Sequence, residues 1–241
     1  MKTITWLSPQ DDPEWFPPLE QSLDDPPGLL AAGGDLAPPR LLAAYRRGIF
    51  PWYSPGQPVL WWSPDPRAVL FPDEFRCSRS LRKTLRNGGF SVTIDEEFAA
   101  IVDACAAPRP HSAGTWITSE MRAAYLALYR LGFAHSVEVR NAGKLAGGLY
   151  GVRLGSVFFG ESMFSRERDG SKVALAHLVE VCRRHHIEVI DCQLSSAHLE
   201  SLGARIIPRM QFQALLAKHI GLAPEPLDGG AGKPSTDTLA P

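Results

Sequence analysis

The stretch SVEVRNAGKLAGGLYGVRLGSVFFGES, residues 136–162, decides the fold. Apolar and polar residues alternate from Ser136 to Arg140, and strand-like runs resume at 148–152 and 156–161. Between these runs, Asn141-Ala142-Gly143 and Leu154-Gly155 carry the glycines that tight turns need. The pattern predicts an antiparallel meander of three strands.

The elements on both sides of the meander complete the pattern of the larger part of the chain. Upstream, we expect helices at 38–48 and 78–86, a strand at 90–94, a helix capped by Asp95 that ends at Ala106, and a helix capped by Thr118 or Ser119 that ends at Gly132. Downstream, the periodicity predicts a helix, a strand, a helix, a strand and a helix at 171–185, 189–193, 195–202, 204–208 and 211–220. This is the element order of N-acetyltransferase-type acyltransferases. We therefore predict an α/β (α+β) fold with a mixed sheet flanked by helices.

Composition divides the chain into three parts. Residues 7–67 are dense in Pro, Gly and Trp, whereas 90–220 alternate between strand and helix patterns. The last residues are rich in Pro, Gly, Ser and Thr and offer little to bury. We predict a small N-terminal domain at 1–65, an acyltransferase-like domain at 66–222 and a disordered tail at 223–241.

Bulk properties exclude several function classes. The formal net charge of −1 gives no global attraction to nucleic acid, so a polyanionic partner must be met by a local patch. The N-terminus lacks the apolar run of a signal peptide, and no stretch has the ~20 apolar residues of a membrane span. The four cysteines form no C-x-x-C pair, and the histidines form no ligand set. We expect a cytoplasmic protein without a metal.

Three polar residues interrupt strands that are otherwise apolar. Glu161 ends the meander, and Asp191 and Gln193 end the strand at 189–193. Alternation places Asp191 and Gln193 on one face of that strand, where a carboxylate beside a carboxamide can orient a nucleophile and accept its proton. The structural alternative is that Asp191 bonds the backbone of the next turn and that Glu161 meets a lysine. Pattern alone leaves both alternatives open.

Apolar and basic residues supply two further candidate surfaces. Phe158, Met163 and Leu149 surround Glu161 in sequence and can build an apolar pocket, although such clusters are often only core. Arg79, Arg82, Lys83 and Arg86 are spaced to share one helix face, which suits contacts to phosphates as well as an ordinary solvated surface. The Trp-rich and Pro-rich segments at 48–56 and 60–67 can form either a stacking surface for a nucleobase or an interdomain contact.

One motif of coenzyme-A-dependent N-acetyltransferases is missing. Those enzymes wrap the pyrophosphate with a glycine-rich loop before the long helix, where the helix dipole favours a phosphate. Here that segment is Arg166-Glu167-Arg168-Asp169-Gly170-Ser171-Lys172, with one glycine and no G-x-G. Coenzyme A is therefore not expected, and no cofactor is predicted.

Taken in order, these motifs resemble the bacterial leucyl/phenylalanyl-tRNA–protein transferases. The resemblance covers roughly residues 28–215 and rests on many short motifs, among them GGDL at 33–36, RGIFPW at 47–52, WWSP at 61–64, GTWI at 114–117, GGLYG at 147–151, GESMFSR at 160–166, SK at 171–172, IDCQ at 190–193, SLGA at 201–204 and IPR at 207–209. Each motif alone is weak, but the ordered set is specific.

The resemblance implies a reaction and its partners. Members transfer Leu, Phe or sometimes Met from an aminoacyl-tRNA to the α-amino group of a protein that begins with Arg or Lys, which marks that protein for N-end-rule degradation. The ester of the aminoacyl-tRNA is already activated, so the reaction needs no ATP, metal or covalent intermediate. The family fold is a small N-terminal domain on an acyltransferase-like domain.

The resemblance also implies roles for single residues. The catalytic-centre residues of the family fall on Glu161, Asp191 and Gln193. Its apolar aminoacyl pocket falls on Phe158, Met163, Leu175 and Leu149, the last standing where some members have Met. Trp52 and Trp116 match residues that stack around the terminal adenosine and the aminoacyl group. Contacts to tRNA fall on Arg79, Arg82, Lys83, Arg86 and Lys172.

Two other functions remain possible at this point. A coenzyme-A-dependent N-acetyltransferase fits the element order but not the missing phosphate loop. A non-catalytic module that recognises tRNA ends or basic N-termini fits the aromatic and basic features but not the polar strand ends.

Overall fold

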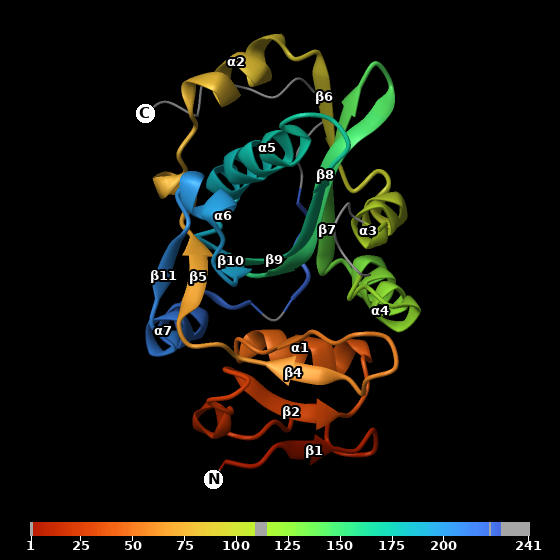
Figure 1. The fold of residues 1–241 in the computed structure, drawn as a ribbon, viewed down its shortest axis with the longest axis vertical. Coiled ribbons are helices and arrows are strands. Elements are labelled where there is room, and N and C mark those ends of the chain that lie inside the picture. Colours follow the sequence, from red (N-terminus) through yellow and green to blue (C-terminus); the bar gives the residue numbers. More distant parts are fainter. Residues whose placement is uncertain (1, 109–114, 222, 228–241) are drawn as a thin grey trace.

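The computed structural model describes residues 2–108, 115–221 and 223–227. A small N-terminal layer lies at one end of the molecule and a larger layered unit at the other (Figure 1). The small layer is a four-stranded sheet of order β1-β2-β4-β3, built from Thr5–Leu7, Leu29–Gly33, Leu60–Trp62 and Phe50–Pro51. Helix α1, Pro38–Arg46, lies between this sheet and the larger unit (Figure 1). Helix α1 was predicted from the sequence, whereas none of these short strands was.

A seven-stranded sheet organises the larger unit. Its order is β11-β5-β10-β9-β8-β7-β6, with bounds Arg205–Ile207, Arg67–Leu70, Val189–Gln193, Val157–Ser165, Lys144–Leu154, Ala134–Asn141 and Phe90–Ile94. β9 and β10 run parallel, and every other neighbouring pair runs antiparallel. The predicted meander is therefore confirmed as β7-β8-β9, and the mixed sheet of the predicted fold class is confirmed as well.

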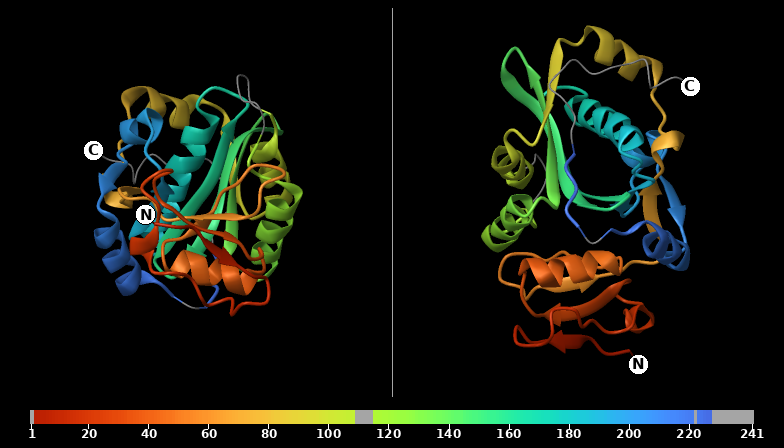
Figure 2. Two further views of the ribbon diagram at one scale, coloured as in Figure 1. Left: turned by 60° about the horizontal axis from the view of Figure 1, so that its bottom comes forward. Right: turned by 180° about the vertical axis from the view of Figure 1, so that it is seen from behind.

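Helices cover the sheet on both faces. Helix α5, Gly170–Arg184, packs against β7, β8 and β9 from one side, and α3, Phe98–Ala106, and α4, Ser119–Arg130, pack from the other (Figures 1 and 2). Helix α2, Arg79–Asn87, extends this cover beside α5, while the short α6, Ala197–Ser201, and α7, Arg209–His219, follow β10 and β11. Each sheet face has its own apolar cluster, and the cluster on the α3 and α4 side continues into the N-terminal layer through Tyr45 and Trp61.

Two helix starts show how well capping can be predicted. The Thr118 hydroxyl accepts the backbone N–H of Met121, as expected for a cap of α4. The prediction that Asp95 caps α3 is wrong, because α3 begins at Phe98 and Asp95 has a φ of 59°. Its carboxylate instead accepts the backbone N–H of Ser136 at 2.7 Å and contacts His135 Nδ1 at 2.6 Å. A contact across the sheet therefore replaces the local cap.

The predicted division of the chain differs from the structure in where the packed C-terminal part ends. The last strand of the small sheet ends at Trp62 and the first strand of the large sheet begins at Arg67, and the boundary at residue 65 stays a prediction. The first residues of the predicted tail, 223–227, pack on the large unit: Arg153 donates to the carboxylate of Glu225 at 2.6 Å and to Pro226 O at 2.7 Å, and Leu227 is buried. The packed chain therefore extends at least to residue 227, and 228–241 lie outside the described residues.

Candidate active site

Two β-bulges bring the polar strand ends together. In β9, Gly160 pairs with Gly151 and Ser162 with Tyr150, so Glu161 is the extra residue. In β10, Asp191 pairs with Val69 and Gln193 with Ala68, so Cys192 is the extra residue there. The regular pairing of β9 with β10 ends at Phe159 and Asp191, two residues before Glu161. Bulges bend a strand and redirect its side chains, and here they open a site between two parallel strands.

Glu161 lies in a cage of hydrogen-bond donors. Its Oε1 accepts from the Tyr45 hydroxyl at 2.7 Å and from Gln193 Nε2 at 3.3 Å, and its Oε2 accepts from the Tyr125 hydroxyl. Burial raises the pKa of Glu161 to about 7, an effect that the two tyrosine hydrogen bonds oppose. The residue as a whole is nevertheless only half-buried. Glu161 therefore changes protonation state near neutral pH, at a position that is not completely buried.

Asp191 has a different environment, because Arg67 neutralises it. Arg67 Nε donates to Asp191 Oδ1 at 2.8 Å and Arg67 Nη2 to Oδ2 at 2.6 Å, and both side chains are fully buried. The Arg67 guanidinium lies between the rings of Phe50 and Phe212, at 4.9 and 4.8 Å from their centroids. Such a bidentate, buried pair holds Asp191 rigidly.

Gln193 links the two carboxylates. Its backbone N–H donates to Asp191 Oδ1 at 2.9 Å, and its own φ is 63°, in the left-handed region. Its side-chain amide reaches Glu161 rather than Asp191. The prediction that Asp191 and Gln193 share a strand face assumed regular alternation, which the bulge at Cys192 breaks. Asp191 thus accepts a hydrogen bond from the backbone of Gln193, and Glu161 accepts one from its side chain.

A cavity of about 260 Å³ opens beside these groups. Its walls include all four residues expected for an apolar pocket, Phe158, Met163, Leu175 and Leu149. Phe158 and Met163 are five residues apart and would point to opposite faces of a regular strand, but the bulge at Glu161 returns both to the α5 side. Leu178, Ile190 and Leu199 complete the apolar wall. The volume suits one side chain rather than a large cofactor.

The polar part of the same cavity contains Glu161, Asp191 and Cys192. Burial raises the pKa of the Cys192 thiol to about 12, so it is not a nucleophile at neutral pH. Among the described residues, no group of three His, Cys, Asp or Glu side chains could hold a metal ion. Within the described ranges, no helix is long and apolar enough to span a bilayer.

The two predicted tryptophans occupy different places. Trp116 lines the cavity. Trp52 lies in the N-terminal layer, is 42% exposed, and packs edge-on against Trp62 with ring centroids 5.6 Å apart. The structure therefore brings Trp116 to the site, while Trp52 is an exposed aromatic surface outside the cavity wall.

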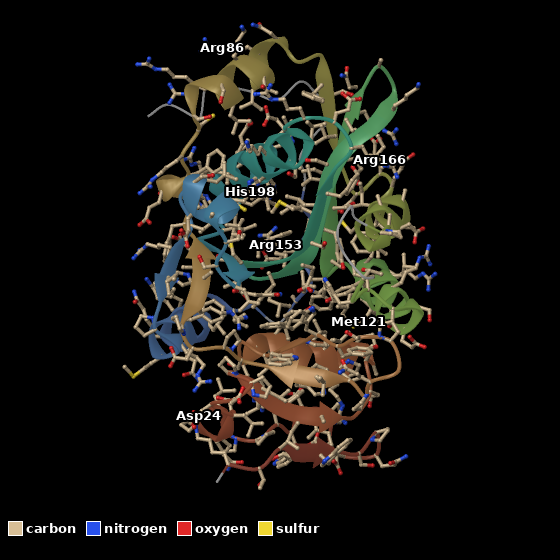
Figure 3. The ribbon with its side chains drawn as sticks, viewed as in Figure 1. Asp24, Arg86, Met121, Arg153, Arg166 and His198 are labelled. Carbon is tan, nitrogen blue, oxygen red and sulfur yellow. The ribbon has the colours of Figure 1, made fainter. Side chains whose placement is uncertain are left out.

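The predicted basic residues lie on and near α2. Leu81 and Leu85 of α2 face the core, which leaves Arg79, Lys83 and Arg86 exposed and Arg82 half-buried. The Arg86 end of α2 is far from the N-terminal layer (Figure 3). Lys172 lies in the first turn of α5 and pairs with Asp169 at 3.1 Å, and the Thr84 hydroxyl of α2 donates to the same carboxylate. Asp169 thus links Lys172 to the basic helix.

The start of α5 contains no phosphate cradle. Asp169 precedes the helix with a φ of 64°, so its own carboxylate lies near the positive end of the helix dipole. A Cβ added to Gly170 would lie 2.5 Å from the carbonyl oxygen of Ala146, so the backbone packs closely where a pyrophosphate would need room. This geometry agrees with the missing glycine-rich loop.

Three residues of the site were not predicted: Arg67, Tyr45 and Tyr125. Arg67 stands alone among apolar residues in β5, and a charge in an otherwise buried strand needs a partner. The tyrosines gave no such signal, because an inward-facing tyrosine on an amphipathic helix looks like ordinary core. Their role becomes visible only where two helices bring both hydroxyls to Glu161.

Comparison with known proteins shows the family of the chain. The sequence model of the family described as leucyl/phenylalanyl-tRNA protein transferase matches residues 69–217, and that of its N-terminal domain matches residues 34–65. The chain belongs to this family. It is an aminoacyl-tRNA–protein transferase, an enzyme that transfers Leu or Phe from tRNA to protein, and the resemblance seen in the sequence is confirmed.

Curated relatives and solved structures give the extent of the similarity. The leucyl/phenylalanyl-tRNA--protein transferase of Pseudomonas entomophila is 58% identical over 90% of this chain and 95% of its own length. That of Aromatoleum aromaticum is 58% identical over 92% of this chain and 93% of its own. Among solved structures, a GCN5-related N-acetyltransferase from Kribbella flavida is 11% identical, with a TM-score of 0.39 over 71% of this chain and 61% of that one.

Proposed function

We propose that this enzyme transfers Leu, Phe or Met from aminoacyl-tRNA to the α-amino group of proteins whose first residue is Arg or Lys. The product carries a degradation signal at its new N-terminus, and the reaction takes place in the cytoplasm. The observation that carries the proposal is that one cavity is lined both by an apolar wall and by Glu161. The apolar wall suits the aminoacyl side chain, and the carboxylate suits a cationic acceptor.

The reaction needs a neutral amine in the right place. The amine nitrogen attacks the ester carbonyl carbon, the bond to the terminal ribose oxygen breaks, and that oxygen takes up a proton while the amine loses one. An α-amino group has a pKa of about 8, so roughly a tenth of it is neutral at pH 7. In our proposal Glu161 accepts the amine proton, because its pKa lies near the working pH and it lines the cavity that would hold the aminoacyl group.

Gln193 and Asp191 have positioning roles in this proposal. The Gln193 amide lies within hydrogen-bond distance of Glu161 and can hold the attacking amine or the ester beside it. The Gln193 side-chain amide reaches Glu161, so polarisation of that amide is not the role we propose for Asp191. Its two oxygens already accept from Arg67 and from the Gln193 backbone, which supports a role in fixing the bulge instead.

A direct transfer assay tests the proposed function. The enzyme is mixed with tRNA charged with labelled leucine and a peptide that begins with Arg, and the peptide is analysed by mass spectrometry. We expect the peptide to gain one leucine at its α-amino group, and an otherwise identical peptide that begins with Ala to gain none. Equal labelling of both peptides would contradict the proposed acceptor, and labelling of neither would contradict the reaction.

The pocket assignment predicts a loss of leucine transfer on truncation of Met163. Met163→Ala removes apolar contact from the cavity wall, which is worth about 1–3 kcal/mol and so about 10-fold or more in kcat/KM for Leu-tRNA. The dissociation constant of uncharged tRNA should not change, because Met163 lies in the cavity. Exposed Met210 provides the control: Met210→Ala should alter neither quantity. Unchanged leucine transfer by Met163→Ala would place the pocket elsewhere.

The basic helix α2 predicts a change in the salt dependence of tRNA binding. Lys83 and Arg86 are exposed on α2, and neither forms an ion pair with another residue of the described part of the chain. If both contact phosphates, Lys83→Ala with Arg86→Ala should lower the slope of log K against log salt by about 1.5 to 2. Titration of tRNA at several salt concentrations measures this slope. An unchanged slope would mean that α2 is an ordinary solvated face.

A further inference from the structure

A second cavity lies immediately beside the active site. It has a volume of about 550 Å³ and is formed by the loop 53–59 on one side and the start of α4 on the other. The loop residues 54–58 are exposed, and a Cβ added to Gly56 would meet nothing within 4 Å. At one end, the hydroxyls of Tyr53 and Thr118 lie 3.1 Å apart and join the two walls. We call this cavity the α4 groove.

A single tight turn separates the α4 groove from the catalytic cavity. Trp116 lines the catalytic cavity and Thr118 lines the groove. The backbone N–H of Thr118 donates to the carbonyl oxygen of Trp116 at 3.0 Å, so the two residues lie on neighbouring sides of one turn. The two cavities are therefore neighbours along the chain, and an acceptor whose first residue occupies the catalytic cavity would have the groove as its nearest further surface on the α4 side.

The charge of the groove suits a polypeptide rather than a nucleic acid. Its lining contains one ionisable carboxylate, Glu120, and no Lys, Arg or His. Hydrogen bonds from its own backbone N–H and from the hydroxyls of Thr118 and Ser119 lower the pKa of Glu120, so its exposed carboxylate is ionised at neutral pH. An anionic wall repels phosphates and attracts cationic side chains.

The groove also lies away from the basic helix. Arg86 on α2 and Met121 on α4 mark opposite ends of the larger unit, with the α4 end beside the N-terminal layer (Figure 3). A direct transfer requires both substrates in the site at once, which two separate approaches allow. We propose that the α4 groove binds the second and third residues of the acceptor polypeptide and that Glu120 favours cationic side chains there. This inference rests on the proposed function and extends it to acceptor selection.

Three acceptors and three variants test the groove. The acceptors are arginine amide, which cannot reach it, and the peptides Arg-Lys-Lys-Ala and Arg-Glu-Glu-Ala. For the natural sequence we expect kcat/KM to be about 3- to 5-fold higher for the lysine peptide than for the glutamate peptide, the size of an exposed ion pair. Glu120→Lys should abolish or reverse this ratio and Glu120→Gln should reduce it. In both variants, kcat/KM for arginine amide should stay within about 2-fold of the value for the natural enzyme.

A matched control carries the same change of charge elsewhere. Glu96 is exposed, lies outside the groove lining, and precedes α3. Glu96→Lys should keep the natural ratio between the two peptides. Equal effects of Glu96→Lys and Glu120→Lys, or an equal loss with arginine amide, would overturn the groove assignment while transfer itself persists. Failure of the natural enzyme to modify any of the three acceptors would overturn the proposed function and the groove with it.

Discussion

Asp191→Ala is expected to lower the free energy of unfolding by about 3–5 kcal/mol, because it leaves the Arg67 guanidinium buried without its counter-ion. Arg67 is 1% exposed, and two of its donors are engaged by Asp191 alone. Small proteins are stable by about 5–15 kcal/mol, so this loss consumes a large share. Chemical denaturation monitored by tryptophan fluorescence measures it. A loss of activity in this variant is therefore no evidence that Asp191 takes part in proton transfer.

A double variant separates stability from positioning. Arg67→Met combined with Asp191→Leu removes both charges, and replacement of a buried pair by apolar residues is often neutral or stabilising. We expect it to recover most of the lost stability but little activity, since the Gln193 backbone N–H has lost its acceptor. If the free energy of unfolding of Asp191→Ala lies within about 1 kcal/mol of that of the natural protein, the pair of Arg67 and Asp191 is not a rigid support.

Glu161→Gln is expected to reduce kcat for transfer by about 100-fold or more, the usual contribution of a general base. The fold should survive, because glutamine has the same shape and the tyrosine hydroxyls around it can accept as well as donate. Single-turnover rates with saturating Leu-tRNA and an Arg peptide measure the effect. Tyr129→Phe is a suitable control, since the Tyr129 hydroxyl donates to Asp95 O at 2.7 Å, away from Glu161.

The same variant should change how stability depends on pH. Because the pKa of Glu161 is raised from 4.5 to about 7 in the folded protein, the folded state binds the proton more tightly than the unfolded chain does. The natural protein therefore loses stability as pH rises from about 4.5 to about 7, whereas glutamine carries no charge to bury. The free energy of unfolding of Glu161→Gln minus that of the natural protein should therefore be larger at pH 8 than at pH 4. Equal differences at both values would contradict the raised pKa.

The regular parts of the fold were predictable, and the irregular parts were not. Alternation and helical period identify β7 to β9, α5 and β10, because each residue's neighbours in sequence determine which face it takes. The strands of the N-terminal layer are two to five residues long and lie in segments rich in Pro and Gly, so their pairing depends on distant segments. The Asp95 prediction failed for the same reason, since a partner on β7 outcompetes the local cap.

At the site, residue identity was easier to predict than contacts. A carboxylate at a buried strand end indicates a special role, which pointed to Glu161 and Asp191. The partners that were not predicted lie far away in the sequence, with Tyr125 36 residues from Glu161 and Arg67 124 residues from Asp191. The two bulges reassign strand faces, and no local pattern announced them. Without the bulge at Glu161, Phe158 and Met163 would not line the same wall. The bulge at Cys192 likewise explains why Asp191 contacts the backbone of Gln193 and Glu161 its side chain.

The central claim, that Glu161 rather than Asp191 accepts the amine proton, is tested most directly by the pH dependence of kcat/KM for the acceptor. In the natural enzyme, both Glu161 and the acceptor ammonium group must lose a proton before the reaction. Log kcat/KM should therefore rise with a slope of two below pH 7 and a slope of one between pH 7 and 8. Glu161→Gln should show a slope of one throughout, and Asp191→Asn should keep both steps at a lower rate. A slope of two that persists in Glu161→Gln and disappears in Asp191→Asn would contradict the account.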